Sequence, residues 1–181
     1  CLVSILPGMA QTEKLTDYVN PFVGTDGYGN VYPGAQIPFG GIQISPDTDS
    51  RFYDAASGYK YNHLTLMGFS LTHLSGTGIP DLGDFLFIPG TGEMKLEPGT
   101  HEDPDQGYCS RYSHDKEWAS PNYYAVELAD YGVKAEMTSG VRSGMFRFTY
   151  PESDNAFIMI DMNHTLWQSC EWSNLRMIND S

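Results

Sequence analysis

Apolar and polar residues alternate along the second half of the chain. YYAVELADYG (123–132) alternates into a turn, VKAEMTSG (133–140) and MFRFTY (145–150) repeat the alternation, and AFIMIDM (156–162) is an almost continuous apolar run. Successive side chains of a β-strand point to opposite faces, so alternation predicts strands that are buried on one face. The continuous run is typical of a strand inside a sandwich.

The first half of the chain adds strand signals but no helix signal. DFLFIPG (84–90) and GGIQISP (40–46) end at Pro-Gly and Ser-Pro pairs, which favour turns. No stretch repeats apolar residues with the period of a helix, and 19 glycines and 11 prolines interrupt the chain too often for long helices. The sequence therefore predicts an all-β fold, an antiparallel β-sandwich, with residues 89–121 as one long surface or functional loop.

The two ends of the chain carry their own signals. CLVSILPGMAQ is typical of the end of a secretory signal: an apolar run, a Pro-Gly pair, then a small residue before a polar one. We expect residues 1–11 to be a signal-peptide remnant and residues 12–181 to be the mature domain; a buried first strand and a lipidated Cys1 are the alternatives. The domain is expected to be truncated at its C-terminal end, because the chain stops soon after a strand-like run. No apolar run approaches the ~18 residues that a membrane span requires.

Composition removes several classes of partner. With a formal net charge of -13 and a pI of about 4.5, the chain would repel a polyanion, so nucleic acid is not an expected partner. The three cysteines are too far apart in sequence to form a zinc motif. If Cys1 leaves with the signal, Cys109 and Cys170 either pair in an oxidising compartment or remain thiols.

Two loops are dense in glycine, GTDGYGNVYPGA (24–35) and SGTGIPDLGD (75–84). A phosphate-binding loop needs a lysine after its glycines and a dinucleotide site needs a helix there, but prolines interrupt both loops. Ser70 and Ser75 lack the Gly-x-Ser-x-Gly turn of hydrolase nucleophiles. The glycines are therefore expected to form tight turns.

Acidic residues and histidines form no recognisable metal motif either. No two of the five histidines have the i, i+4 spacing of a zinc helix. Asp47 and Asp49 lack the rest of a calcium loop, so we expect this pair in a solvated turn. Asp81 and Asp84 are separated by an odd number of positions, so in an extended segment their side chains point to opposite faces. The two carboxyls of a glycosidase have to flank one glycosidic bond, which this spacing does not favour. Asp81 is expected either to accept hydrogen bonds from a ligand or to cap a turn.

The stretch GFSLTHLSGTG (68–78) is expected to be one short loop, and it concentrates hydrogen-bonding groups without formal charge. Sugars are neutral, rich in hydroxyls, and have apolar faces that pack on aromatic rings. A site that hydrogen-bonds a given hydroxyl strongly rejects analogues that lack it, so this stretch favours carbohydrate recognition. The aromatic candidates for stacking are Phe22, Tyr28, Tyr32, Phe69 and Trp118.

Taken together, these motifs resemble glycoside hydrolase family 92, the calcium-dependent exo-acting α-mannosidases. The resemblance covers YVNPFVGTDGYGNVYPGAQIPFGGIQISPDT (18–48), SGYKYNHLTLMGFSLTHLSGTGIPDLGDFLFIPGTG (57–92), ASPNYYAVELADYGVKAEMTSGVRSGMFRFTYP (119–151) and SDNAFIMIDMNHT (153–165). No single motif is specific, but their combined order is.

The resemblance implies an architecture and a division of labour. The family joins an amino-terminal, supersandwich-like β-sandwich to a carboxy-terminal (α/α)-barrel, and this chain covers only the sandwich. Hydrolysis inverts the anomeric centre, and a calcium ion holds mannose O2 and O3. The acid, the base and the calcium ligands belong to the barrel, so no catalytic residue, metal ligand or cofactor site is expected in this chain. The implied partners are α-mannoside glycans and the barrel, in a bacterial periplasm or outside the cell.

The resemblance further implies that loops of the sandwich line the sugar pocket. The expected substrate contacts are Phe22, Gly24, Thr25, Ser70, His73, Ser75, Gly76, Thr77 and Asp81. Many relatives have a histidine where Tyr28 or Asn30 stands, so direct contact at these two positions is open. Two other functions remain: a stand-alone carbohydrate-binding module, or a sandwich that only supports a neighbouring domain.

Overall fold

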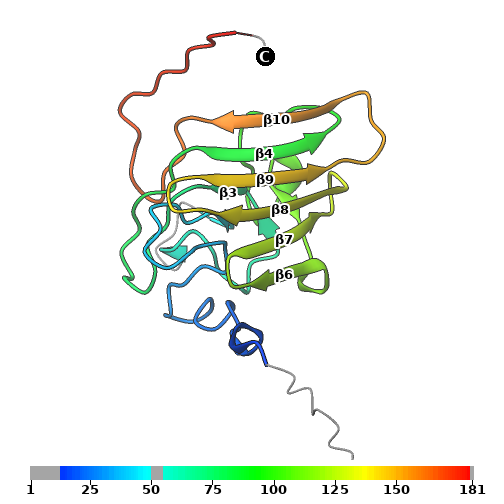
Figure 1. Cartoon of the computed structure of the whole chain (residues 1–181). Coiled ribbons are helices and arrows are strands. Elements are labelled where there is room, and N and C mark those ends of the chain that lie inside the picture. Colours follow the sequence, from blue (N-terminus) through cyan, green and yellow to red (C-terminus); the bar gives the residue numbers. More distant parts are fainter. Residues whose placement is uncertain (1–12, 50–54, 180–181) are drawn as a thin grey trace, which may run out of the picture.

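The structure is a computed structural model that describes residues 13–49 and 55–179 (Figure 1). Within these ranges the regular elements are β-strands and short 3-10 helices. The strands are β1 (Ser45–Asp47), β2 (Thr65–Leu66), β3 (Gly68–Ser70), β4 (Leu86–Thr91), β5 (Ser110–Arg111), β6 (Glu117–Ser120), β7 (Tyr123–Leu128), β8 (Val133–Ser139), β9 (Gly144–Thr149) and β10 (Ala156–Asp161). The 3-10 helices are η1 (Leu15–Tyr18), η3 (Pro104–Gln106) and η4 (His114–Lys116).

The strands form two four-stranded antiparallel sheets and one two-stranded sheet. The strand order is β1-β3-β4-β10 in the first, β6-β7-β8-β9 in the second, and β2-β5 in the small one. The two large sheets share a core: Phe69 of β3 lies in one buried cluster with Tyr124 of β7 and Met137 of β8. The rings of Phe87 and Phe146 also meet between the sheets, 5.0 Å apart. This arrangement confirms the predicted all-β antiparallel sandwich.

The alternating segments form strands as predicted. In β8 the residues Val133, Ala135 and Met137 are buried while Lys134 and Thr138 are exposed. The alternation holds at these positions because β8 has a hydrogen-bonded neighbour on each side and one face on the core. Glu136 is the exception: it is 6% exposed on the polar face, where the Tyr123 hydroxyl and the Arg147 guanidinium donate to its carboxylate.

AFIMIDM forms a strand as predicted, but this strand does not lie inside the sandwich. The segment forms β10, an edge strand of its sheet, and its burial alternates along its length. Ile158 is 52% exposed and Ile160 is 41% exposed. An apolar run shows that a strand prefers burial, but it carries no information on whether a neighbour covers each face.

Two loop predictions are also corrected. Residues 68–78 do not form a single loop, since Gly68–Ser70 is the buried strand β3. A Cβ added to Gly68 would lie 2.8 Å from the Leu86 side chain and from the Phe87 carbonyl oxygen, so this strand approaches β4 as only glycine allows. Residues 89–121 are not one loop either, because they contain β5, β6 and two 3-10 helices.

A buried polar network surrounds Glu117, the first residue of β6. Glu117 is 9% exposed and accepts hydrogen bonds from the Tyr59 and Tyr124 hydroxyls and from His114 Nδ1, the last at 2.6 Å. Burial, then the neighbouring Tyr112 and Glu117, raise the pKa of Tyr59, so its hydroxyl stays protonated and donates. Each buried polar atom of this carboxylate therefore has a donor, as the interior requires.

Several predictions about the chain ends and cysteines meet the structure only in part. The predicted signal remnant, residues 1–11, lies outside the described residues. Cys109 is buried, Cys170 is half-buried, and no disulfide bond joins them. In the described part of the chain no helix has the length and hydropathy that crossing a bilayer demands.

Candidate functional site

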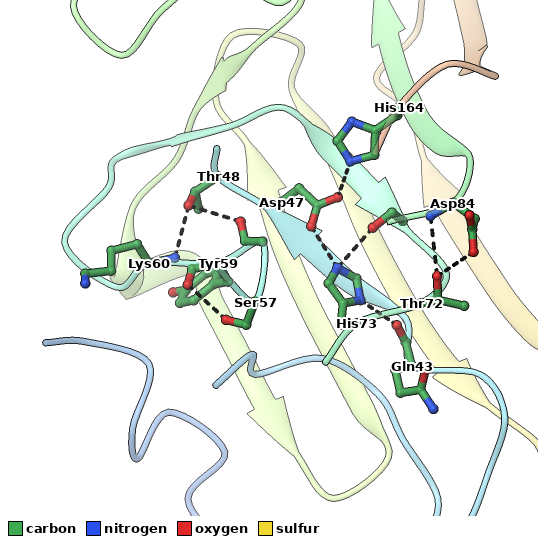
Figure 2. Close-up of polar contacts among 12 residues, drawn as sticks. Gln43, Asp47, Thr48, Ser57, Tyr59, Lys60, Thr72, His73, Asp84 and His164 are labelled. Carbon is green, nitrogen blue, oxygen red and sulfur yellow. Dashed lines mark hydrogen bonds and ion pairs between the residues drawn. The ribbon is translucent and has the colours of Figure 1, made fainter. Parts of the chain in front are cut away.

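A buried carboxylate holds two imidazole rings at the end of β1 (Figure 2). Asp47 Oδ1 accepts a hydrogen bond from His73 Nε2 at 2.7 Å, and Asp47 Oδ2 accepts one from His164 Nε2 at 2.7 Å. The side chains of Asp47 and His73 are 0% exposed, and that of His164 is 2% exposed. The three residues come from β1, from the loop after β3 and from the segment after β10, so one carboxylate joins three distant parts of the chain.

Both ring nitrogens of His73 face hydrogen-bond acceptors. Its Nδ1 lies 2.7 Å from the backbone carbonyl oxygen of Gln43, which can only accept. Its Nε2 faces the Asp47 carboxylate at 2.7 Å. This geometry suits a ring that donates from both nitrogens and pairs with the buried Asp47 carboxylate.

The environment keeps Asp47 ionised. Burial alone would raise its pKa, but the positive charge of His73 and the hydrogen bonds from His164 and His73 outweigh that effect. The pKa of Asp47 therefore lies below its ordinary value. Gly58 allows this packing, because a Cβ there would lie 2.1 Å from Asp47 Oδ1 and the residue has φ +85°.

Ser70, His73 and Asp47 do not form a hydrolytic triad, although all three residue types are present. Ser70 Oγ lies 3.0 Å from His73 Nε2, the same nitrogen that donates to Asp47. A triad needs the serine and the carboxylate on opposite ring nitrogens, so that one imidazole can take the proton while the other holds its orientation. Ser70 is also 0% exposed. Its hydroxyl serves as a hydrogen-bond partner of the buried His73 ring.

The two glycine-dense loops meet above this cluster. The Gly76 backbone N–H donates to the Asn30 carbonyl oxygen at 2.6 Å, which joins the second loop to the first. The Tyr32 ring lies 5.1 Å from the His73 ring, measured between centroids. The base of the second loop is closed by Thr72, whose hydroxyl donates to Asp84 Oδ2 at 2.8 Å. His73 thus supports both loops from below.

The structure divides the nine predicted contact residues by exposure. Four form an exposed rim at the tips of the loops: Ser75, Gly76, Thr77 and Asp81. Phe22 and Gly24 are half-buried, and Thr25, Ser70 and His73 are buried. We call Ser75–Thr77 and Asp81 the rim. Contact between any of these residues and a sugar stays a prediction.

The first loop is held by its own hydrogen bonds. The Thr25 hydroxyl donates to the Phe22 carbonyl oxygen at 2.8 Å, and the Thr25 carbonyl accepts from the Tyr61 backbone N–H at 3.0 Å. The Phe22 ring packs edge-on against Tyr61, with centroids 5.9 Å apart. Phe22 and Thr25 therefore fix the shape of the loop, while Tyr28 at its tip is 99% exposed.

The residues that sequence reasoning missed are Asp47 and His164. The expectation that Asp47 and Asp49 lie in a solvated turn is wrong, because both are 0% exposed. Asp47 meets its two partners across 26 and 117 residues of sequence, a distance over which no local pattern carries information. Among the described residues, no group of three or more His, Cys, Asp and Glu is arranged to hold a metal ion.

Comparison with known proteins adds an independent finding. A family model described as the glycosyl hydrolase family 92 N-terminal domain matches residues 18–181. A family GH92 alpha-mannosidase from Bacteroides thetaiotaomicron has a similar structure, with a TM-score of 0.92 and 99% sequence identity, over 93% of this chain and 23% of that chain. A structure of the same mannosidase in complex with mannoimidazole is equally similar.

More distant relatives agree with this result. The family GH92 inverting mannosidase from Bacteroides thetaiotaomicron VPI-5482 has a TM-score of 0.66 and 27% identity, over 83% of this chain and 20% of that chain. A secreted glycosidase of Arthroderma benhamiae is 30% identical over 145 residues, which are 76% of this chain and 17% of that protein. The chain thus spans about a fifth of the length of the relatives it matches.

Replacement of Asp47 by Asn tests the buried ion pair. Each carboxylate oxygen of Asp47 accepts from one imidazole N–H. Asparagine keeps only one such oxygen, and its NH₂ group would face the N–H of the other imidazole, donor against donor. We expect the free energy of unfolding to fall by about 3 to 5 kcal/mol, as when one partner of a buried pair is removed. Denaturant unfolding measures the change. The control Asp81→Asn, at an exposed site, should stay within about 0.5 kcal/mol; equal losses in both variants would contradict the assignment.

The same ion pair predicts a direction in pH. Because folding lowers the pKa of Asp47, the unfolded chain binds this proton more readily than the folded chain. The stabilisation is therefore complete above the ordinary carboxyl pKa of about 3.9 and is lost as the pH falls toward the folded-state value. We expect the melting temperature to drop across this acid range and to drop less in Asp47→Asn. If the melting temperatures of the two proteins fall equally as the pH is lowered, Asp47 does not have this role.

Proposed function

Because the chain belongs to the glycosyl hydrolase family 92 N-terminal domain family, we propose that it is the substrate-shaping domain of a secreted, inverting exo-α-mannosidase that removes terminal α-linked mannose from glycans. The observation that carries this proposal is the 99% identity to a family GH92 alpha-mannosidase over 93% of the chain. The inverting outcome follows the second mannosidase, which is named as an inverting enzyme.

We assign the chemistry of bond cleavage to polypeptide outside this chain. Inversion needs a general acid and a general base about 6.5 to 9.5 Å apart, with room for water between them. The carboxylates near the rim are already engaged: Asp84 with the Thr72 hydroxyl, and Asp81 with the Leu82 backbone N–H at 2.8 Å. We propose that the acid, the base and the calcium ligands lie in a carboxy-terminal (α/α)-barrel. The segment alone is then inactive.

The rim would contribute recognition rather than catalysis. Ser75, Gly76 and Thr77 expose hydroxyls and backbone groups that carry no formal charge. Such groups suit a neutral hexose, and they reject an analogue that lacks the matching hydroxyl. The buried members of the predicted set, Thr25 and His73, would act by holding the two loops in place. Gly24 at φ +88° would let the first loop turn sharply toward the cleft.

Secretion is proposed on two grounds. The Arthroderma benhamiae relative is named as a secreted glycosidase. Residues 1–11 have the sequence pattern of a signal-peptide end. A bacterial periplasm is the specific location that we propose, because glycan-degrading enzymes act where their substrates enter the cell.

The division of labour can be tested by comparing two proteins. We expect the isolated 181-residue chain to hydrolyse neither aryl α-mannosides nor α-linked mannobioses, while the full-length gene product hydrolyses them and loses activity when calcium is chelated. Release of mannose is the measurement. Turnover by the isolated chain would show that catalytic groups lie within it and would refute the assignment.

The recognition role of the rim predicts a loss that is specific to activity. Ser75→Ala combined with Thr77→Ala should lower kcat/KM on an α-mannoside. The expected loss corresponds to about 1 to 3 kcal/mol of transition-state stabilisation. The melting temperature should not change, since both side chains are exposed. Ser153→Ala, exposed in the turn between β9 and β10, is the matched control. If the double variant and the control keep equal kcat/KM, the sandwich only supports its neighbour.

A further inference from the structure

A hollow lies beyond the end of β10, and none of the rim residues lines it. It has a volume of about 430 Å³, within the range of small-molecule pockets. The residues that line it and bear on its chemistry are Asp161, Asn163, His164, Thr165, Trp167 and Gln168. The Asp47 carboxylate separates the two regions: Oδ1 holds His73 under the rim, and Oδ2 holds His164 at this pocket.

His164 is one of the residues that line the pocket. Its side chain is 2% exposed, and its Nε2 donates to the ionised Asp47 carboxylate. In the neutral ring this bond places the proton on Nε2 and leaves Nδ1 as an acceptor. Nδ1 points away from Asp47 (Figure 2) and has no hydrogen-bond partner among the described residues. Nδ1 is not among the described buried polar atoms that lack a partner, so it remains accessible and can accept a hydrogen bond from a ligand hydroxyl or N–H.

An aromatic surface stands beside that acceptor. Trp167 lines the pocket, is 55% exposed, and has a left-handed backbone with φ 73°. A bulky residue rarely adopts this conformation, and strain of this kind recurs at ligand-binding positions. The neighbouring Gln168 amide adds a donor and an acceptor.

The charge of the pocket favours a neutral ligand. Its only carboxylate, Asp161, accepts the Asn163 backbone N–H at 2.9 Å and a hydrogen bond from the Tyr108 hydroxyl. No lysine or arginine lines the pocket, so an anion would find no counter-charge. An aromatic face, two amides and an imidazole acceptor instead match a molecule with an apolar face edged by hydroxyls.

We propose that this pocket binds a second hexose unit, outside the cleft in which a terminal residue would be cleaved. A ligand hydroxyl donates to His164 Nδ1, the Trp167 ring covers the apolar face of the sugar, and Gln168 binds a further hydroxyl. Asp47 is a positioning residue here, because its bond to Nε2 fixes the orientation of the His164 ring. The choice of mannose as the sugar rests on the proposed function, whereas the pocket itself does not.

Fluorine NMR of the full-length gene product labelled with 5-fluorotryptophan can read this pocket directly. The resonance that is missing in Trp167→Ala belongs to Trp167, and the one missing in Trp118→Ala is the control, since Trp118 is 65% exposed on the other sheet. On titration with methyl α-mannoside, the Trp167 resonance should shift and saturate while the Trp118 resonance does not move. Gln168→Ala should weaken this binding roughly tenfold.

Kinetics separate the second site from the cleft. Trp167→Ala should raise KM for an α-linked mannotrioside about tenfold and leave kcat/KM for an aryl α-mannoside unchanged. An equal loss on both substrates, or a Trp167 resonance that does not respond to the sugar, would overturn the inference. If the full-length protein hydrolyses no mannoside, the proposed function fails, while the shift of the Trp167 resonance still decides whether the pocket binds sugar.

Discussion

The hydrogen bonds that the buried Asp47 carboxylate accepts from the imidazoles of His73 and His164 constrain the rest of this structure. A charge without water around it is strongly unfavourable, so every group that faces Asp47 must be placed to donate. Gly58 has to lack a side chain to admit the carboxylate, and Gln43 has to turn a carbonyl toward His73. The packing of apolar side chains brings the sheets together, but this pair determines how three separate segments meet.

The same constraint links the two places where a ligand would bind. His73 lies under the glycine-dense loops and His164 lines the pocket beyond β10, with one carboxylate between them. A change at Asp47 would therefore disturb both at once, through orientation rather than through contact. On both proposals, Asp47 acts on ligand binding without touching a ligand.

The fold was readable from the sequence where the physics is local. Alternation identified β7, β8 and β9, because a strand with one covered face repeats every second residue. It could not show that β10 lies at an edge or that Asp47 is buried, because both depend on partners distant in sequence. The composition of residues 68–78 suggested one recognition loop, yet the buried half of this stretch, including Ser70 and His73, belongs to the core. Only the tip at Ser75–Thr77 faces outward. The sequence did not single out Trp167, because one aromatic residue forms no repeating pattern.

The exposed edge of β10 has a consequence for handling the protein. Among the described strands its only hydrogen-bonded neighbour is β4, so one row of backbone N–H and C=O groups remains open beside Ile158. Such an edge is a template for any extended chain, including a second molecule of the same kind. Self-association of the isolated domain would begin along this strand. A lysine in place of Ile158 would oppose it, because a charged side chain disfavours pairing between two edge strands.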